Sequence, residues 1–135
     1  MHRYLPLLGR ILLGLIFVMS GANKITGFDG TQQYMAAQGM PATAFFLTGA
    51  IAVEILGGLS VILGYRGRLG AAALILFLIP ATLIFHTDFS DQTQMIMFLK
   101  NLSIMGGLLL VTAYGTGPLS LSAQPDTKTS AAVTD

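Results

Sequence analysis

Five ionisable side chains lie within or at the edges of long apolar runs, where a charged group is costly and therefore informative. They are Arg10, Lys24, Glu54, His86 and Lys100. One charge at the centre of a membrane helix costs about 2.5–3.5 kcal/mol on insertion scales, so such groups usually face protein or water. Together they could bind a polar ligand head or move protons. The alternative is structural, with buried ion pairs that only fix how the helices pack.

Glu54 is the most informative of these residues. It lies about ten residues from either end of its apolar run, too far for a short side chain to reach the membrane surface. Gly58 shares its helical face and would let a second helix or a flat ligand approach closely. We predict Arg10 as the ion-pair partner of Glu54, because Arg10, Phe17 and Lys24 are spaced seven apart and share one face. The alternative for Arg10 is that its side chain extends to the cytoplasmic head groups.

Lys100 and Asn101 stand side by side about one to two turns inside the last apolar run. Neighbouring helical positions point about 100° apart, so the two side chains face different neighbours. Lys100 could instead extend to the membrane surface, whereas the shorter Asn101 needs a partner within the protein. We therefore predict a polar pocket in the periplasmic half of the membrane. Its candidate residues are Arg10, Lys24, Glu54, His86, Lys100 and Asn101.

Lys24 and His86 also have simpler interpretations. Both lie at the ends of their apolar runs, where Lys24 could act as an interfacial anchor and His86 could be solvated. His86 and the nearby Asp88 are too few ligands for a metal ion, so no metal site is predicted.

Four apolar runs must position these residues, and each is about 17–22 residues long, enough to cross roughly 30 Å of hydrocarbon. The runs are Tyr4–Ala22, Thr43–Gly64, Leu69–Phe85 and Gln94–Tyr114. Hydrophobic residues make up 53% of the 135 residues and charged residues only 10%, against about 25% charged residues in soluble domains. In lipid a helix satisfies its own backbone. The predicted fold is all-α, a membrane-spanning four-helix bundle over residues 1–121, with a polar, disordered cytoplasmic tail at 122–135.

The start of the chain also resembles a secretory signal peptide. Arg3 precedes the first apolar run, and Ser20–Ala22 resembles a cleavage region. Arg10 near the run favours a retained helix that packs in the bundle.

The connections between the runs predict the orientation of the chain. The amino-terminal side and the second connection carry Arg3, Arg66 and Arg68. The other two connections have only Lys24 near their borders, together with Asp29, Asp88 and Asp91. Basic residues are enriched in cytoplasmic loops, so both termini should face the cytoplasm of a bacterial inner membrane. The longest connection contains GTQQYMAAQGMP, which predicts a short interfacial helix ended at Gly39 and Pro41.

Two segments share a glycine pattern. EILGGLSVILGY and SIMGGLLLVTAY each place Gly-Gly before Leu, with Tyr seven residues after the second Gly. We interpret Gly57, Gly58, Gly106 and Gly107 as helix-packing residues. The pattern would also fit two parallel hairpin repeats, although glycine is common in membrane helices anyway.

Four segments resemble the DoxX family of small bacterial membrane proteins over about Arg10 to Leu121. They are RILLGLIFVMSGANKITGFDGTQQYMAAQGMP, EILGGLSVILGYRGRLGA, FHTDF and FLKNLSIMGGLLLV. The resemblance implies a four-helix inner-membrane protein. The family's namesake is similar to a subunit of an archaeal thiosulfate:quinone oxidoreductase, and other members are linked to membrane redox complexes, while most have no assigned reaction. By resemblance, this chain would be a redox-associated, quinone-interacting membrane subunit.

The composition limits what such a subunit could do. The chain has no Cys, which excludes disulfides, Cys-ligated Fe–S clusters and a thiol redox couple on this chain. A redox role would therefore need a bound quinone or a redox partner protein, and whether the chain is an enzyme is left open. Two alternatives are a non-enzymatic binding or transport module for a small amphiphile, expected as a homo-oligomer, and a structural assembly partner. The net charge of +1 gives no indication of nucleic acid.

Overall fold

All regular elements in residues 2–121, which the computed structural model describes, are helices. They are α1 (Tyr4–Thr26), α2 (Phe28–Ala37), α3 (Thr43–Leu63), α4 (Gly67–Phe85) and α5 (Gln92–Tyr114). The four long helices are long and apolar enough to cross a membrane. The predicted all-α fold and its four spans are therefore confirmed. The polar tail predicted at 122–135 lies outside the described residues.

The helix ends differ from the predicted runs where polar residues continue a helix. α1 extends beyond Ala22 to Thr26, because the polar residues that end the apolar run do not interrupt the helical backbone. The short helix predicted in this connection is α2, whose place at the membrane surface stays a prediction, and the chain turns at Gly39 with φ of 86°. Such a positive φ favours glycine, so the end of α2 follows from the sequence.

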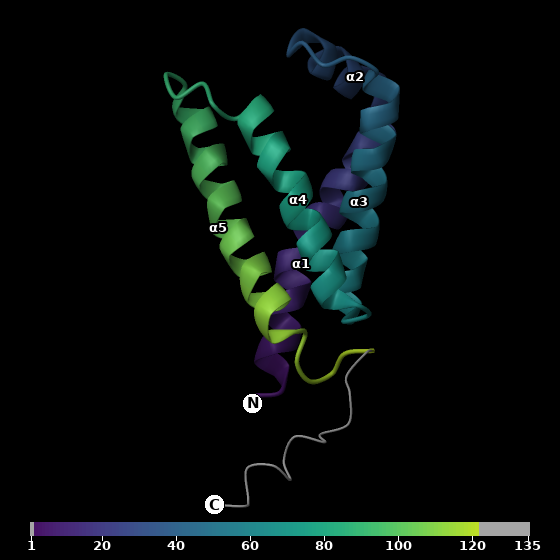
Figure 1. Cartoon of the computed structure of the whole chain (residues 1–135), viewed down its shortest axis with the longest axis vertical. Coiled ribbons are helices and arrows are strands. Elements are labelled where there is room, and N and C mark those ends of the chain that lie inside the picture. Colours follow the sequence, from purple (N-terminus) through teal and green to yellow (C-terminus); the bar gives the residue numbers. More distant parts are fainter. Residues whose placement is uncertain (1, 122–135) are drawn as a thin grey trace, which may run out of the picture.

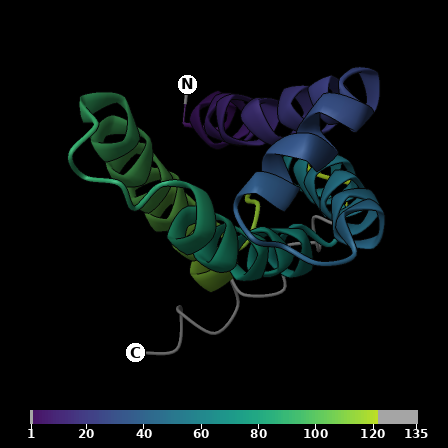
Figure 2. The same ribbon diagram turned by 90° about the horizontal axis from the view of Figure 1, so that it is seen from above.

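The long helices alternate in direction, and the chain enters α1 and leaves α5 at the same end (Figure 1). We call this the terminal end, and the opposite end, which α2 crosses, the α2 end. α1 packs along α3, α3 packs against α4, and α4 packs against α5, whereas α1 and α5 touch only briefly. Toward the α2 end, α4 and α5 diverge from α1 and α3, so the bundle opens into a V (Figures 1 and 2). The internal repeat of two hairpins stays a prediction.

Glycines allow the closest helix contact in the bundle. A Cβ on Gly58 would lie 2.9 Å from the carbonyl oxygen of Gly14, and a Cβ on Gly57 would lie 2.8 Å from Leu74. The pair in α3 thus receives α1 on one side and α4 on the other. In α5, a Cβ on Gly107 would lie 3.3 Å from a methyl group of Leu13, whereas Gly106 has nothing within 4 Å.

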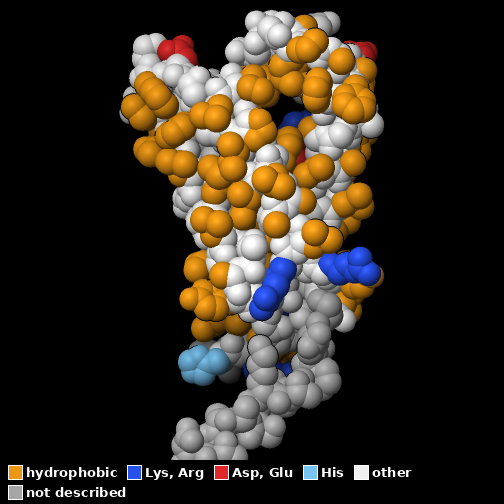
Figure 3. Space-filling model, viewed as in Figure 1, with side chains coloured by type: hydrophobic (Ala, Val, Ile, Leu, Met, Phe, Trp, Pro, Cys, Tyr) orange, Lys and Arg blue, Asp and Glu red, His pale blue; other side chains and the backbone are white. Residues whose placement is uncertain are grey.

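The shared core lies toward the terminal end, where all four long helices meet. Its buried residues are Phe17, Val61, Ala71, Leu74, Leu78 and Leu108. Many other apolar side chains cover the outside of the bundle (Figure 3), as expected where lipid rather than water surrounds the protein. The α2 end therefore has less packed interior and more room for a ligand.

A candidate membrane-embedded binding site

Glu54 forms an ion pair with Lys24. Lys24 Nζ lies 2.7 Å from Glu54 Oε1, and the side chains are 26% and 1% exposed. It is the only ion pair within residues 2–121. The angles at this contact do not meet those of a hydrogen bond, so Glu54 Oε1 has no hydrogen-bond donor among those residues. Opposite charges this close still attract strongly in a partly buried setting, so the pair ties α1 to α3.

The predicted ion pair between Arg10 and Glu54 is wrong. Arg10 is only 3% exposed, and its guanidinium instead donates to the carbonyl oxygens of Ile62 at 3.3 Å, Pro118 at 3.3 Å and Leu119 at 2.8 Å. The antiparallel crossing of α1 and α3 explains the error.

The two helices meet where Gly14 faces Gly58. Arg10 lies one turn from this point toward the terminal end, and Glu54 lies one turn from it toward the α2 end. Because each turn of four residues advances about 6 Å, the two residues sit at levels about 12 Å apart. Lys24 is on the same side of the crossing as Glu54 and can reach it.

Ser20 completes the surroundings of the Lys24 ammonium. Lys24 Nζ donates to Ser20 Oγ at 2.7 Å, one helical turn away. An ammonium has three N–H donors. With Ser20 and Glu54 on two sides, at least one N–H remains for a ligand, because no other partner of Lys24 occurs in the described part of the chain.

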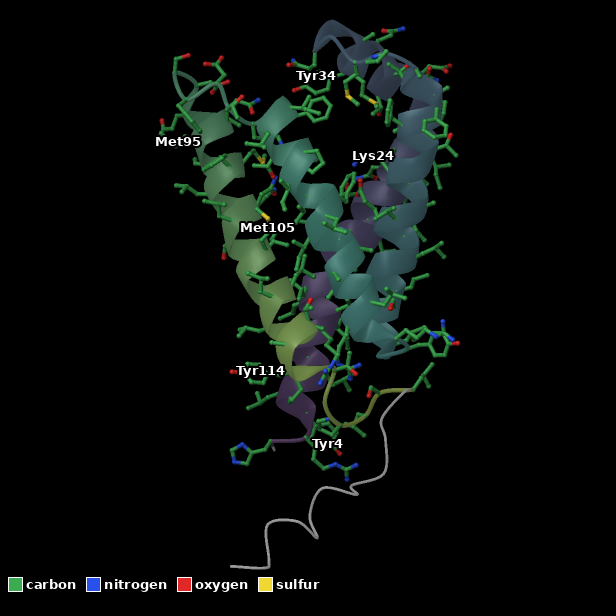
Figure 4. The ribbon with its side chains drawn as sticks, in the orientation of Figure 1. Tyr4, Lys24, Tyr34, Met95, Met105 and Tyr114 are labelled. Atoms are coloured by element: carbon green, nitrogen blue, oxygen red, sulfur yellow. The ribbon has the colours of Figure 1, made fainter. Side chains whose placement is uncertain are left out.

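A cavity of about 410 Å³, open to the outside of the bundle, lies beside Lys24. It is lined by Ile16, Met19, Ser20, Asn23 and Lys24 of α1 and by Thr31 of α2. The polar residues gather near α2, and Ile16 and Met19 extend the lining toward the membrane interior. On the face seen in Figure 3 the surface is hollowed beneath α2, with a basic and an acidic side chain at its bottom. Figure 4 places Lys24 there, between α3 and α4.

Asn101 is hydrogen-bonded to Thr82, which is the partner within the protein that its position in an apolar run requires. Asn101 Nδ2 donates to Thr82 Oγ1 at 3.0 Å, and the two residues are 8% and 2% exposed. This bond joins α5 to α4. No hydrogen bond or ion pair in residues 2–121 links Thr82 or Asn101 to Lys24 or Glu54.

Lys100 lies apart from these contacts. Its side chain is exposed, and Nζ contacts Met97 Sδ at 3.2 Å, one turn nearer the α2 end. This geometry agrees with the alternative in which Lys100 extends toward the membrane surface. The structure thus brings together Lys24 and Glu54, and separately joins Asn101 to another helix, but it does not gather all six candidate residues.

His86 lies at the rim of the α2 end, where α4 ends. Its Nδ1 is 2.8 Å from Gln94 Oε1. Next to His86, the rings of Phe85 and Tyr34 stack with their centroids 5.4 Å apart, which joins α2 to α4. Figure 4 shows Tyr34 above Lys24. A second cavity of about 220 Å³ adjoins this stack, and its lining includes Asp88. No three potential metal ligands of the types His, Asp and Glu gather anywhere between residues 2 and 121.

Sequence reasoning missed three partners at the site. Ser20 could have been found, because it precedes Lys24 by four residues and so lies on the same helix face. Thr82 and the stack of Tyr34 on Phe85 join residues far apart in the sequence, and no local signal indicates them.

Comparisons with known proteins place the chain in a family. The DoxX family profile matches residues 5–87, a stretch that contains Lys24 and Glu54. The chain is 40% identical over 115 residues to the inner membrane protein YqjF of Escherichia coli (strain K12), covering 85% of this chain and 87% of that protein. The chain belongs to the DoxX family. This DoxX protein is also 37% identical over 123 residues to the inner membrane protein YphA of the same strain, covering 87% of each.

A third relative carries a description of activity. CatD of Bacillus subtilis (strain 168), provisionally described as an oxidoreductase, is 35% identical over 75 residues, which cover 56% of this chain and 54% of CatD. No solved structure matches this DoxX protein. The named inner-membrane relatives and the four apolar helices make it a multi-pass inner-membrane protein.

Proposed function

We propose that this DoxX protein is a redox-associated membrane subunit that binds the head group of a lipid-soluble quinone beside Lys24. The observation that carries this proposal is the partly exposed Lys24 side chain, which lines a cavity with a polar end and an apolar end and whose ammonium is paired with buried Glu54. An amphiphile matches such a lining, because its head can be hydrogen-bonded while its tail stays in contact with apolar groups.

The chemistry of the lining suits a quinone ring. Lys24 can donate a hydrogen bond to one ring carbonyl, and the side chains of Asn23 and Thr31 offer further polar contacts. Ile16 and Met19 would contact the tail. The provisional description of CatD as an oxidoreductase supports a redox role. Since this chain has no Cys, electron transfer would require a partner protein or the bound quinone itself.

Quinone binding by the purified chain tests this proposal. We expect the wild type in detergent to bind decyl-benzoquinone and Lys24→Met to bind it at least ~10-fold more weakly, the size of one charge-assisted hydrogen bond of about 1.5–3 kcal/mol. Lys100→Met is the matched control, because it removes an exposed ammonium outside the cavity. Absence of binding to the wild type, or equal affinity for Lys24→Met, would contradict the proposal.

A non-enzymatic binding module is the second candidate function. It is favoured by the cavity lining, which contains no side chain that could carry electrons. This alternative predicts that the protein binds simple amphiphiles, such as long-chain alcohols, as tightly as decyl-benzoquinone of similar tail length. A clear preference for the quinone would argue against it.

We also propose that both termini face the cytoplasm. Arg3, Arg66 and Arg68 lie toward the terminal end. Asp29 in α2 and Asp88 and Asp91 in the α4–α5 connection lie at the α2 end, where Lys24 in the last turn of α1 is the nearby basic residue. Single cysteines in this Cys-free chain test the orientation. A membrane-impermeant maleimide should label Ser90→Cys, in the α4–α5 connection, in intact spheroplasts, and should label Tyr65→Cys, in the α3–α4 turn, only after lysis. The reverse pattern would place the α2 end in the cytoplasm.

A further inference from the structure

The cavity beside Lys24 poses a problem of selectivity. Its apolar end extends along α1, where many exposed side chains of the bundle meet lipid. Membrane lipids commonly carry anionic head groups. A lone ammonium at the wall of such a cavity would attract these anions, and they would compete with any neutral ligand.

Glu54 removes this attraction. Its carboxylate lies 2.7 Å from Lys24 Nζ and is 1% exposed, so it stands behind the ammonium and does not reach a ligand itself. Lys24 and Glu54 together carry no net charge, yet Lys24 keeps an N–H that can donate to an acceptor. The pair therefore offers a hydrogen bond without offering a net positive charge.

No other charged side chain in residues 2–121 acts as the hydrogen-bond donor at the cavity wall or as the carboxylate that neutralises it. Arg10 is bonded to main-chain carbonyls on the far side of the helix crossing. Lys100 contacts Met97 on α5. Asp29 is exposed in the first turn of α2 and does not line the cavity. The charge at the cavity wall is thus decided by Lys24 and Glu54.

We propose that Glu54 is a positioning residue that determines specificity, because it makes the cavity accept neutral lipids with a carbonyl oxygen and reject anionic amphiphiles. The inference rests on the proposed function only in using the same cavity, and it extends to any neutral carbonyl-bearing lipid. Ser20 assists by holding the ammonium from the other side.

A matched pair of probes tests this proposal. The purified full chain in neutral detergent is titrated with a fluorescent twelve-carbon fatty acid, ionised at pH 8, and with its methyl ester, which has the same tail and a neutral carbonyl. We expect the wild type to prefer the ester at least ~10-fold. Glu54→Gln, which keeps shape and removes charge, should bind the acid at least ~10-fold more tightly than the wild type does. A difference of tenfold corresponds to about 1.4 kcal/mol.

Controls separate a specificity role from a structural one. Asp29→Asn removes a carboxylate outside the cavity and should leave both affinities unchanged. A purely structural role for Glu54 would weaken both probes in Glu54→Gln without reversing their order, and that result would overturn the proposal. If Glu54→Gln does not fold, the wild type alone still decides, because equal affinity for acid and ester would refute the proposal.

The outcome is distinguishable from a failure of the proposed function. If the wild type prefers the ester and Glu54→Gln gains affinity for the acid, but decyl-benzoquinone does not bind, the quinone assignment falls and the role of Glu54 stands. If it binds decyl-benzoquinone but shows no preference for the ester, the role of Glu54 falls and the quinone assignment stands.

Discussion

Two basic residues of α1 have contrasting partners, and the contrast separates a structural charge from a candidate ligand-binding one. Arg10 is buried, and its hydrogen bonds within residues 2–121 go to main-chain carbonyls, including that of Ile62 in the last turn of α3. Carbonyls at a helix C-terminus carry partial negative charge and favour a cation there. Lys24 faces a carboxylate and remains partly exposed to a cavity. Arg10 thus caps the C-terminal end of α3, whereas Lys24, also basic and on the same helix, lines a cavity.

The ion pair should make Lys24 matter for stability as well as for binding. Lys24→Met leaves Glu54 buried without its cation and should destabilise the protein by about 1–3 kcal/mol, the usual cost of leaving a buried polar group without its partner. Adding Glu54→Leu should restore much of this loss, because it removes the unpaired carboxylate. Thermal unfolding in detergent measures both effects.

Lys100→Met serves as the control for this prediction. Its side chain is exposed, and among residues 2–121 its ammonium has a thioether as its one polar contact, so the change should stay within about 0.5 kcal/mol. Equal losses for Lys24→Met and Lys100→Met would show that the ion pair contributes nothing specific.

At the scale of elements, the two Gly-Gly pairs have different surroundings although their sequences match. Gly58 lies where the backbones of α1 and α3 meet, whereas Gly106 has nothing within 4 Å. α1 and α3 share a long interface, and α5 leaves α1 after a short contact. The first pair therefore sets a helix crossing, and that crossing determines which side chains of α1 and α3 are level with each other.

Alanine at the two positions should have opposite effects. A Cβ on Gly58 would meet the Gly14 carbonyl oxygen at 2.9 Å, and overpacking of this kind costs about 1–3 kcal/mol. Gly106→Ala meets no atom and should be neutral or stabilise the helix by up to about 1 kcal/mol. Thermal unfolding compares the two. A loss of stability in Gly106→Ala would indicate that Gly106 packs against another molecule.

At the scale of the whole molecule, the bundle is tied at both ends by different means. At the terminal end, Arg10 holds the segment after α5 through Pro118 and Leu119. At the α2 end, the stack of Tyr34 on Phe85 joins the two sides of the V. The interior between these ties contains the Lys24–Glu54 pair.

Removing the terminal tie should loosen that end of the molecule locally. Arg10→Met loses three hydrogen bonds to carbonyls, each worth about 1.5–3 kcal/mol when the donor is charged. Hydrogen exchange followed by mass spectrometry should show faster exchange in residues 115–121 and the end of α5, with little change in α2. Arg3→Met, an exposed control, should change neither. Uniformly faster exchange would instead indicate global destabilisation.

Much of this architecture is determined by the sequence alone. Four runs of membrane-spanning length leave the helix as the structure that satisfies its own backbone in lipid, and Gly39 marks the turn after α2. The need of Asn101 for a protein partner could also be predicted, since a short amide within an apolar run cannot reach water.

Only the tertiary structure decided which partners these residues have. Arg10 and Lys24 are both basic, lie on one face of α1 and could each pair with Glu54 as far as the sequence indicates. The choice depends on the level at which α1 and α3 cross, and the contact of Gly14 with Gly58 sets that level. Helical periodicity gives the direction of a side chain around its own axis, whereas its partner depends on how far one helix slides along another, which only packing settles.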